Sequence, residues 1–358
     1  MAAYWTIYGM WALGAVQFAR KHSIRGDRFL FAVGLLLTAC FVGLRFEIGG
    51  DWHQYLELYE LMYFQPLFDS LRVTDPGYAF FNWAGAQVDW GVWFPNLACA
   101  LIFCAGLGRL ARDQPNPWLA VLVAVPYLII VVAMGYTRQA AAIGVLCYAV
   151  VGASERNILR LVVIAGIAGL FHKTAILMLL VLLAPVITRR FVIGTLGTLM
   201  FGFFFYFFLS SFQDRLVTNY VQASYDSQGA GIRVAMNVVA GGMMLVFRNR
   251  MGFDEYQKTF WTLNALLAVV SAVALAYLES STGVDRIALF LIPLQIVTFS
   301  RLPYALSSTK DKALPSLLFG VMAYSFAVQY VWLNFADNAA SWVPYKSFVW
   351  TPPAPKVS

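Results

Sequence analysis

Residues 158–188 read ILRLVVIAGIAGLFHKTAILMLLVLLAPVIT, an apolar run whose middle is broken only by the pair His172-Lys173. One helix over the whole run would exceed the roughly 20 residues that cross a bilayer. Two short helices that meet at His172-Lys173 fit better, and they keep the downstream loops on the side that their basic residues favour. Residues 117–153 repeat the pattern, with Tyr136-Thr137-Arg138 as the break. The run therefore predicts membrane-spanning helices joined by polar turns.

The composition of the whole chain agrees with a membrane location. Hydrophobic residues make up 60% and charged residues only 12% of the 358 residues, whereas soluble domains have roughly a quarter charged residues. We therefore expect one all-α integral membrane domain over residues 1–358, a polytopic transmembrane helical bundle. In a membrane protein, a net charge of +7 reflects basic residues in the cytoplasmic loops. No nucleic-acid partner is therefore expected.

About twelve apolar segments are long enough, or nearly so, to cross a bilayer. They are residues 4–20, 29–44, 90–108, 117–135, 138–153, 158–171, 174–188, 191–212, 232–247, 260–278, 286–300 and 314–333. An amino terminus on the outer side of the membrane places most of the 25 Lys and Arg residues in cytoplasmic loops, as the positive-inside rule favours. Two longer segments, 45–89 and 211–231, then form outer loops.

The first outer loop is the longest polar segment, and it predicts short amphipathic helices. Asp51 follows two glycines and is a candidate N-cap, with Gln54 in position to close a capping box. Asp75 and Pro76 fit a second helix start, as N-cap and first helical residue. The loop therefore carries polar groups to the outer membrane surface, where chemistry on a polar substrate can take place.

Four basic residues are expected at the outer starts of helices: Arg138, Lys173, Arg233 and Arg286. A helix start already carries partial positive charge, so a cation there is locally unfavourable. A shared anion would relieve this conflict, and with Arg45 nearby we expect a diphosphate site. The alternative is that these side chains anchor helices in the headgroup layer, and Asp285 beside Arg286 offers that arginine a neutralising partner.

Short motifs along the chain resemble a known family. In order they are Arg45 with Gly50-Asp51 and Tyr55, then Asp75-Pro76-Gly77-Tyr78 for Glu-Pro-Gly-Tyr, Arg138-Gln139, His172-Lys173-Thr174-Ala175 for His-Lys-Ser-Ala, and Arg286. Over residues 45–290 the chain is similar to polytopic membrane proteins of the EpsG family, related to the Wzy polymerases of exopolysaccharide and O-antigen assembly. One departure is Phe290, near which the family pattern leads us to expect a tyrosine.

The resemblance implies a GT-C-like fold and a metal-independent glycosyltransferase without cofactors. Such an enzyme joins undecaprenyl-diphosphate-linked oligosaccharides at the periplasmic face of the bacterial cytoplasmic membrane, and its partners include membrane lipid, a flippase and a chain-length regulator. The expected substrate-binding residues are Arg45, Arg138, Lys173, Arg233, Arg286, Asp75, Tyr78, Tyr55 and Gln139. Asp51 and His172 compete as the catalytic base, each with a structural alternative as a helix cap or a buried histidine.

Other functions remain open at this point. A glycan ligase or a membrane acyltransferase could use the same outer arginines with a different acceptor. A lipid-linked sugar transporter would carry its polar groups near mid-membrane, whereas the charged residues here collect at the outer helix ends. The four cysteines and three histidines show no metal-ligand spacing, so no metal site is expected.

Overall fold

The computed structural model describes residues 1–21, 25–154, 157–187, 199, 202, 229–277, 281–307 and 313–351, and over these it is helical, with one isolated β-bridge between Arg45 and Ser347. The elements are α1 (Ala2–Lys21), α2 (Arg25–Gly43), α3 (Trp52–Leu61), η1 (Met62–Phe64), α4 (Leu67–Val73), α5 (Pro76–Gln87), α6 (Trp93–Arg112), α7 (Pro117–Ala124), η2 (Val125–Ala133), α8 (Thr137–Val150), α9 (Ile158–Phe171), η3 (Lys173–Leu177), α10 (Met178–Ile187), α13 (Ala230–Phe247), η5 (Arg248–Arg250), α14 (Glu255–Tyr277), α15 (Ser281–Ala288), η6 (Leu289–Leu291), α16 (Pro293–Leu306), α17 (Leu314–Phe335) and η7 (Asp337–Ser341).

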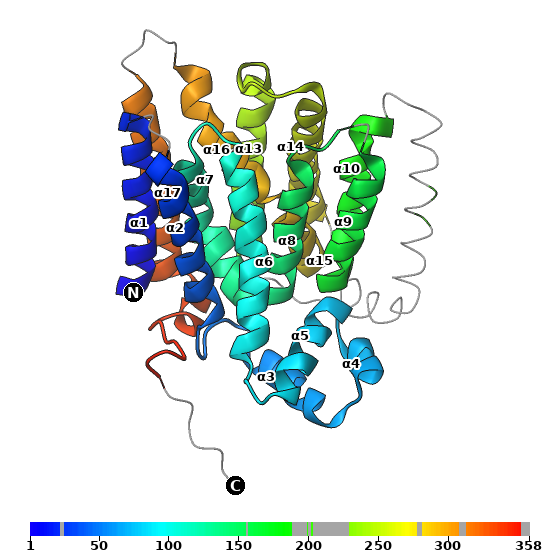
Figure 1. The fold of residues 1–358 in the computed structure, drawn as a ribbon. Helices are drawn as coiled ribbons and strands as arrows, with labels where there is room; N and C mark the ends of the chain where they lie inside the picture. Colours follow the sequence, from blue (N-terminus) through cyan, green and yellow to red (C-terminus); the bar gives the residue numbers. More distant parts are fainter. Residues whose placement is uncertain are drawn as a thin grey trace.

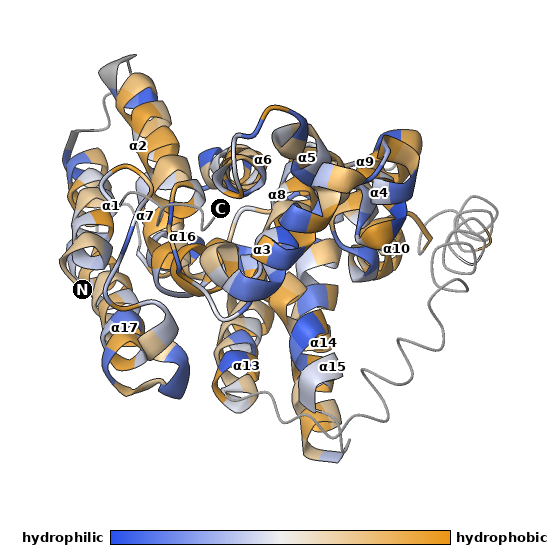
Figure 2. Ribbon diagram, turned by 90° about the horizontal axis from the view of Figure 1, so that it is seen from below, coloured by the Kyte–Doolittle hydropathy of each residue, from blue (hydrophilic) through white to orange (hydrophobic). Residues whose placement is uncertain are grey.

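The long helices stand side by side in a bundle, and α3, α4 and α5 lie together at one end of it (Figure 1). Seen from that end, α3 runs across the ends of the bundle helices, and α5 packs against α6 and α9 (Figure 2). We call this the α3–α5 end. Both polar breaks of the apolar runs lie there, because Arg138 and Lys173 contact Asp75 at the start of α5.

The predicted breaks in the two apolar runs are confirmed. In the first run, α9 ends at Phe171 and a tight turn of helix begins at Lys173, so the chain reverses at His172. In the second, α7 continues as the π-helical η2, which ends at Ala133, and α8 begins at Thr137. Pro126 lies at the start of η2 and has no N–H to give the regular ladder.

The number of membrane spans is established only in part. Four described helices are long and apolar enough to cross a bilayer, namely α6, α13 with η5, α14 and α17, and the pair α15 to α16, bent by 42°, makes a fifth if it is one span. Pro117–Ala133, Ile158–Phe171 and Lys173–Ile187 are apolar but shorter. The total of about twelve spans therefore stays a prediction, and most of the expected span 191–212 and of the loop 211–231 lies outside the described residues.

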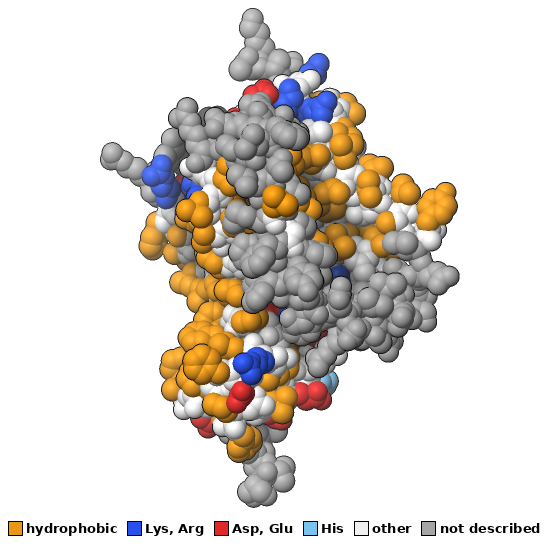
Figure 3. Space-filling model, turned by 90° about the vertical axis from the view of Figure 1, so that its right-hand side faces the viewer, with side chains coloured by type: hydrophobic (Ala, Val, Ile, Leu, Met, Phe, Trp, Pro, Cys, Tyr) orange, Lys and Arg blue, Asp and Glu red, His pale blue; other side chains and the backbone are white. Residues whose placement is uncertain are grey.

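Surface charges are distributed unevenly between the two ends. On the face shown in Figure 3, most of the visible Lys and Arg side chains lie near the end opposite α3–α5, and most of the visible Asp and Glu side chains lie over the α3–α5 end, although each end also shows a charge of the other sign. This is the asymmetry on which the predicted orientation depends, with the cytoplasm at the basic end.

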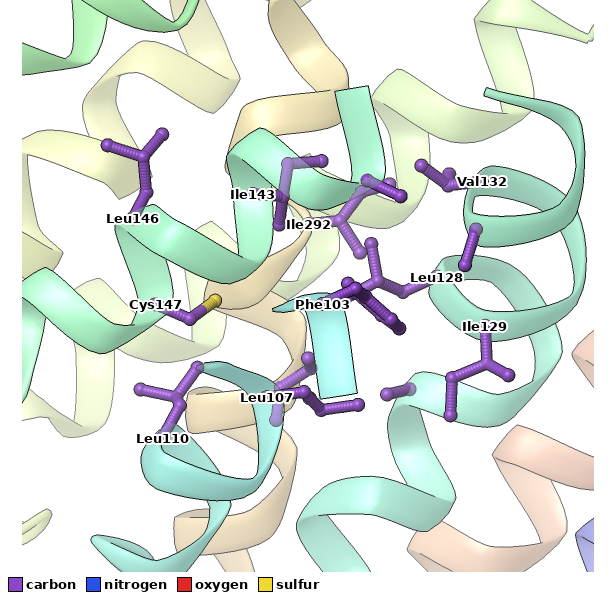
Figure 4. Packing of buried hydrophobic residues seen from close by; sticks show 14 of the residues in the cluster. Phe103, Leu107, Leu110, Leu128, Ile129, Val132, Ile143, Leu146, Cys147 and Ile292 are labelled. Atoms are coloured by element: carbon purple, nitrogen blue, oxygen red, sulfur yellow. The ribbon is translucent and has the colours of Figure 1, made fainter. Parts of the chain in front are cut away.

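Small residues bring the central helices close together. A Cβ added to Gly106 of α6 would lie 1.8 Å from the carbonyl oxygen of Gly144 in α8, and one added to Gly144 would lie 2.5 Å from the Cα of Phe103. Close approach of this kind drives helix packing in membranes, where apolar burial gives little preference for a neighbour over lipid. Around the contact, side chains from α6, η2 and α8 and Ile292 interlock (Figure 4).

The two predicted N-caps hold the expected positions but do not act as caps. Asp51 precedes α3 and Asp75 precedes α5, with Pro76 as the first helical residue, as predicted. Neither aspartate accepts a capping hydrogen bond through its side chain, so the predicted capping box with Gln54 is wrong. The Asp75 carboxylate instead accepts from Arg138 and from the backbone N–H of Lys173, and the Asp51 carboxylate has no hydrogen-bond partner among the described residues.

Candidate active site

Asp75 connects three of the motifs that lie far apart in the sequence. Its Oδ2 accepts a hydrogen bond from a terminal nitrogen of Arg138 at 2.9 Å, and its Oδ1 accepts one from the backbone N–H of Lys173 at 3.3 Å. The hydroxyl of Thr74 accepts from the same arginine nitrogen at 2.9 Å. The buried carboxylate therefore fixes the start of α5 to the first turns of α8 and η3.

Arg138 is held on one side and open on the other. It is the second residue of α8, where the helix dipole disfavours a cation, and its guanidinium lies 6.0 Å from the ring centroid of Tyr55. Its side chain remains 29% exposed. Tyr55 is buried beneath it and meets the ring of buried Tyr78 edge-on at 5.5 Å. The two tyrosines thus form an aromatic floor, and the arginine keeps an accessible edge.

Arg286 lacks the neutralising partner that its neighbour was expected to give. The carboxylate of Asp285 turns away and pairs with Arg233 through both oxygens, at 2.5 and 2.7 Å. The expectation that Asp285 neutralises Arg286 is therefore wrong. Within the described residues the Arg286 side chain contacts Tyr136, whose ring centroid is 4.7 Å away, and no carboxylate.

The helix position of Arg286 also differs from the prediction. It lies in the last turn of the short helix α15, not at the start of an inward-running span. The dipole argument therefore does not apply to it, since a cation is favoured in the last turn. Gln139 holds this turn by donating from Nε2 to the carbonyl oxygen of Arg286 at 2.6 Å. Gln139 thus positions Arg286 beside α8 through the backbone.

The positive charges of Arg286 and Arg138 both act on the carboxyl group of Asp51. Burial raises the pKa of its carboxyl, and the positive charges of Arg286 and Arg138 oppose this shift. Its side chain makes no hydrogen bond or ion pair with any described residue. The turn before it is fixed by Gly49, which has a φ of 104° and lies so close to Met134 that a Cβ would be 2.7 Å from the carbonyl oxygen. Asp51 is therefore a positioned carboxylate with free acceptor oxygens.

His172 lies in the turn between α9 and η3, where the charges of Arg138 and Arg286 also act on it. Its Nδ1 lies 2.7 Å from the hydroxyl of Thr174, and its ring meets that of Phe290 at 5.9 Å. Burial, followed by the charges of Arg138, Arg286 and Lys173, lowers the pKa of His172 to about 3. The histidine is therefore neutral at physiological pH. The position near which a tyrosine was expected holds Phe290, against the imidazole, so it offers no hydroxyl.

Arg45 and Arg233 are taken up by the protein itself. Arg45 is fully buried and donates to the carbonyl oxygens of Val42 and Ile48, to the amide oxygen of Asn96 and to the hydroxyl of Thr137, at 2.6 to 3.4 Å. These contacts join α2 to α6 and α8. Arg233 is likewise buried against Asp285. The geometry favours a structural role for both arginines in place of the expected diphosphate contact.

The site also contains residues that the sequence prediction left out. Tyr136 stacks on Arg286, and Thr74 shares Arg138 with Asp75. Thr74 directly precedes the predicted cap Asp75, and Tyr136 begins the predicted break Tyr136-Thr137-Arg138, so their neighbourhood was a usable signal. The pairing of Asp285 with Arg233 across 52 positions left no such signal.

The model of the EpsG family matches residues 28–347. The chain belongs to the EpsG family. The match covers nearly the whole chain and extends the motif resemblance, which covered residues 45–290, in both directions. EpsG proteins are a Wzy-type polymerase family, so the family indicates a polymerase of the exopolysaccharide type. No curated protein and no solved structure matches this EpsG-family chain, and its described residues hold no group of three or more His, Cys, Asp or Glu side chains arranged for a metal ion.

Proposed function

We propose that this EpsG-family chain is a polysaccharide polymerase that joins undecaprenyl-diphosphate-linked oligosaccharide repeat units at the periplasmic face of the bacterial cytoplasmic membrane. One observation carries the proposal: Asp51, a carboxylate without a protein partner among the described residues, lies within the fields of Arg286 and Arg138 at the α3–α5 end. A base beside two fixed cations is the combination that glycosyl transfer from a diphosphate needs. In this proposal the fold is GT-C-like and the α3–α5 end faces the periplasm.

The reaction is a displacement at the anomeric carbon of the growing glycan. A hydroxyl oxygen of the incoming lipid-linked repeat unit forms a bond to this carbon while the bond from the carbon to the diphosphate oxygen breaks. The diphosphate leaves with the electron pair as undecaprenyl diphosphate, and the hydroxyl proton passes to the base. The products are a chain longer by one repeat unit, on the lipid of the acceptor, and the released lipid diphosphate.

Two arginines bind the leaving group in this mechanism. Arg286 and Arg138 stabilise the charge that develops on the diphosphate, because fixed donors in a site of low dielectric act more strongly than water does. Lys173 adds charge from the turn between α9 and η3. Asp75 and Gln139 position the cations, the first through Arg138 and the second through the backbone of Arg286. The buried tyrosines Tyr55 and Tyr78 support Arg138 from below.

Asp51 is the better of the two candidate bases. A base works best when its pKa lies near the operating pH, and burial moves the pKa of Asp51 upward in that direction. The pKa of His172 moves the opposite way, to about 3, which makes its imidazole a weak proton acceptor. We assign His172 to orienting the substrate in its neutral form, with Thr174 fixing the ring.

We expect the reaction to need no metal ion, because basic side chains are assigned to the diphosphate. Phosphoryl and diphosphate charges in proteins are neutralised either by divalent cations or by arginine and lysine clusters. Arg286, Arg138 and Lys173 supply the second kind here. We therefore expect a chelator to leave the reaction rate unchanged.

The test is a reconstituted reaction. Purified protein in lipid vesicles receives oligosaccharides on undecaprenyl diphosphate, with a chelator and without nucleotide sugars, and the products are sized on a gel. A ladder with one-repeat spacing supports the polymerase. Transfer of a preformed glycan to a different acceptor, without a ladder, would instead indicate a ligase. Movement of intact substrate across the vesicle membrane without any new bond would indicate a transporter.

A further inference from the structure

A cavity lies beside Tyr136, at the α3–α5 end of the bundle. It has a volume of about 180 Å³ and is enclosed by η2, the start of α13, the end of α17 and η7. A protein cavity of about 150 Å³ is known to accept a benzene ring. The space is therefore large enough for one six-membered ring, and Arg138, Arg286 and Asp51 are not among the residues that line it.

The side chain of Tyr136 separates this cavity from the proposed active site. The Arg286 guanidinium stacks on the Tyr136 ring at 4.7 Å, and Tyr136 also lines the cavity. The charges of Asp51 and Arg286 act on this tyrosine together with those of Arg233 and Asp285. If Arg286 binds the diphosphate of a substrate, only the side chain of Tyr136 lies between that diphosphate and the cavity.

The arginine in the cavity wall is paired with a carboxylate. Arg233 lines the cavity, both oxygens of Asp285 accept from its guanidinium, and the hydroxyl of Tyr127 accepts from it at 2.9 Å. A bidentate pair of this kind neutralises its own charge and leaves polar edges. At the rim, the exposed Asp337 adds a carboxylate. The wall therefore disfavours a second diphosphate and suits a neutral ligand that carries hydroxyl groups.

Two tryptophans supply flat apolar surface on the opposite wall. Trp332 is partly buried, and its ring meets Trp342 at 5.2 Å with the planes 87° apart. Trp342 is itself fixed by donating from its indole nitrogen to the carbonyl oxygen of Ile130 at 2.8 Å. Rigid aromatic faces beside a few polar groups are the usual lining of sites that bind small polar rings.

We infer that this cavity binds one neutral sugar ring of the lipid-linked oligosaccharide. Trp332 stacks on the ring, and Asp337 accepts hydrogen bonds from its hydroxyls. The inference rests on the proposed function for the identity of the ligand, and it adds a sugar subsite that lies apart from the arginine cluster. Bound there, the sugar is held beside the diphosphate, on the far side of Tyr136.

The test measures binding of sugar without lipid and without turnover, so that it does not depend on polymerase activity. The probe is the oligosaccharide obtained by hydrolysis of the polysaccharide that cells lose when this chain is deleted, titrated into the purified protein and followed by saturation-transfer NMR. We expect Trp332→Ala to weaken binding at least tenfold. Asp337→Asn, at an exposed rim position, should weaken it severalfold without affecting the fold.

Trp90→Ala is the matched control, because this exposed tryptophan precedes α6 and lies outside the cavity. It should bind as the wild type does. The inference is overturned if wild-type protein fails to bind the oligosaccharide, if both cavity variants bind normally, or if Trp90→Ala loses as much affinity as Trp332→Ala. In the reconstituted reaction the cavity variants should raise KM with kcat nearly unchanged, whereas variants of the arginine cluster should lower kcat.

Discussion

Asp75 holds Arg138 in a salt bridge of 2.9 Å, and its second oxygen accepts the backbone N–H of Lys173 at 3.3 Å. One carboxylate thus aligns two of the cations assigned to the diphosphate. Its position before Pro76 suggested a helix cap, but the cap bond is not made. The aspartate is a positioning residue whose effect on the reaction passes through Arg138.

Replacing this carboxylate tests the positioning role. Asp75→Asn keeps the shape and loses the charge, so Arg138 should become mobile and the rate of chain extension should fall at least tenfold. Because the loss acts on the leaving group, we expect kcat to fall more than KM rises. Asp69→Asn is the control, since Asp69 is exposed on the neighbouring helix α4. Equal rates for both variants would remove Asp75 from the mechanism.

The pH dependence distinguishes the two candidate bases. A base must be deprotonated to accept the hydroxyl proton, so the rate should rise with pH through the pKa of Asp51, which burial raises above the usual value of about 3.9. His172, with a pKa of about 3, stays neutral over this pH range and should add no change to the pH–rate profile. Asp51→Asn should remove the acid limb and lower the rate by roughly 10² to 10⁴.

His172→Gln serves as the comparison for this experiment. It should lower the rate while leaving the acid limb in place, because the titrating group is still present. An acid limb that survives in Asp51→Asn and disappears in His172→Gln would assign the base to the histidine instead.

The fold was predictable where local patterns determine it. The apolar runs and their breaks at Arg138 and His172 placed the helices and brought the motifs to one end of the bundle. Pairings between distant residues were not predictable. Nothing near Asp285 in the sequence indicates that its partner is Arg233 in place of the adjacent Arg286, and nothing near Arg45 indicates that its donors are satisfied by α2, α6 and α8.

The ion pair between Arg233 and Asp285 should be important for stability. Removing one partner of a buried pair leaves a charge without compensation, at a typical cost of about 3–5 kcal/mol. Arg233→Gln should therefore lower the yield of folded protein and its melting temperature in detergent. The double variant Arg233→Gln with Asp285→Asn should recover a large part of this loss. A single variant as stable as the wild type would refute the structural role of the pair.

Packing of α6 on α8 should depend on glycine. Gly144→Ala adds a Cβ that would lie 2.5 Å from the Cα of Phe103, so the helices must separate. Overpacking of this kind costs about 1–3 kcal/mol, and thermal unfolding should occur at lower temperature. Gly166→Ala in α9 meets no atom within 4 Å and should leave the melting temperature unchanged. Equal melting temperatures for the two variants would contradict the close crossing.

In the proposed mechanism, Arg286 binds the diphosphate that leaves. Its most direct test is the rate of chain extension by purified Arg286→Ala, on undecaprenyl-diphosphate oligosaccharides, with Arg248→Ala at the opposite end of the bundle as control. Loss of a fixed donor to a developing anion typically costs 10²- to 10³-fold in kcat. We predict a loss of this size for Arg286→Ala, with normal insertion and melting temperature, and none for Arg248→Ala. A rate within threefold of the wild type for Arg286→Ala would contradict the account.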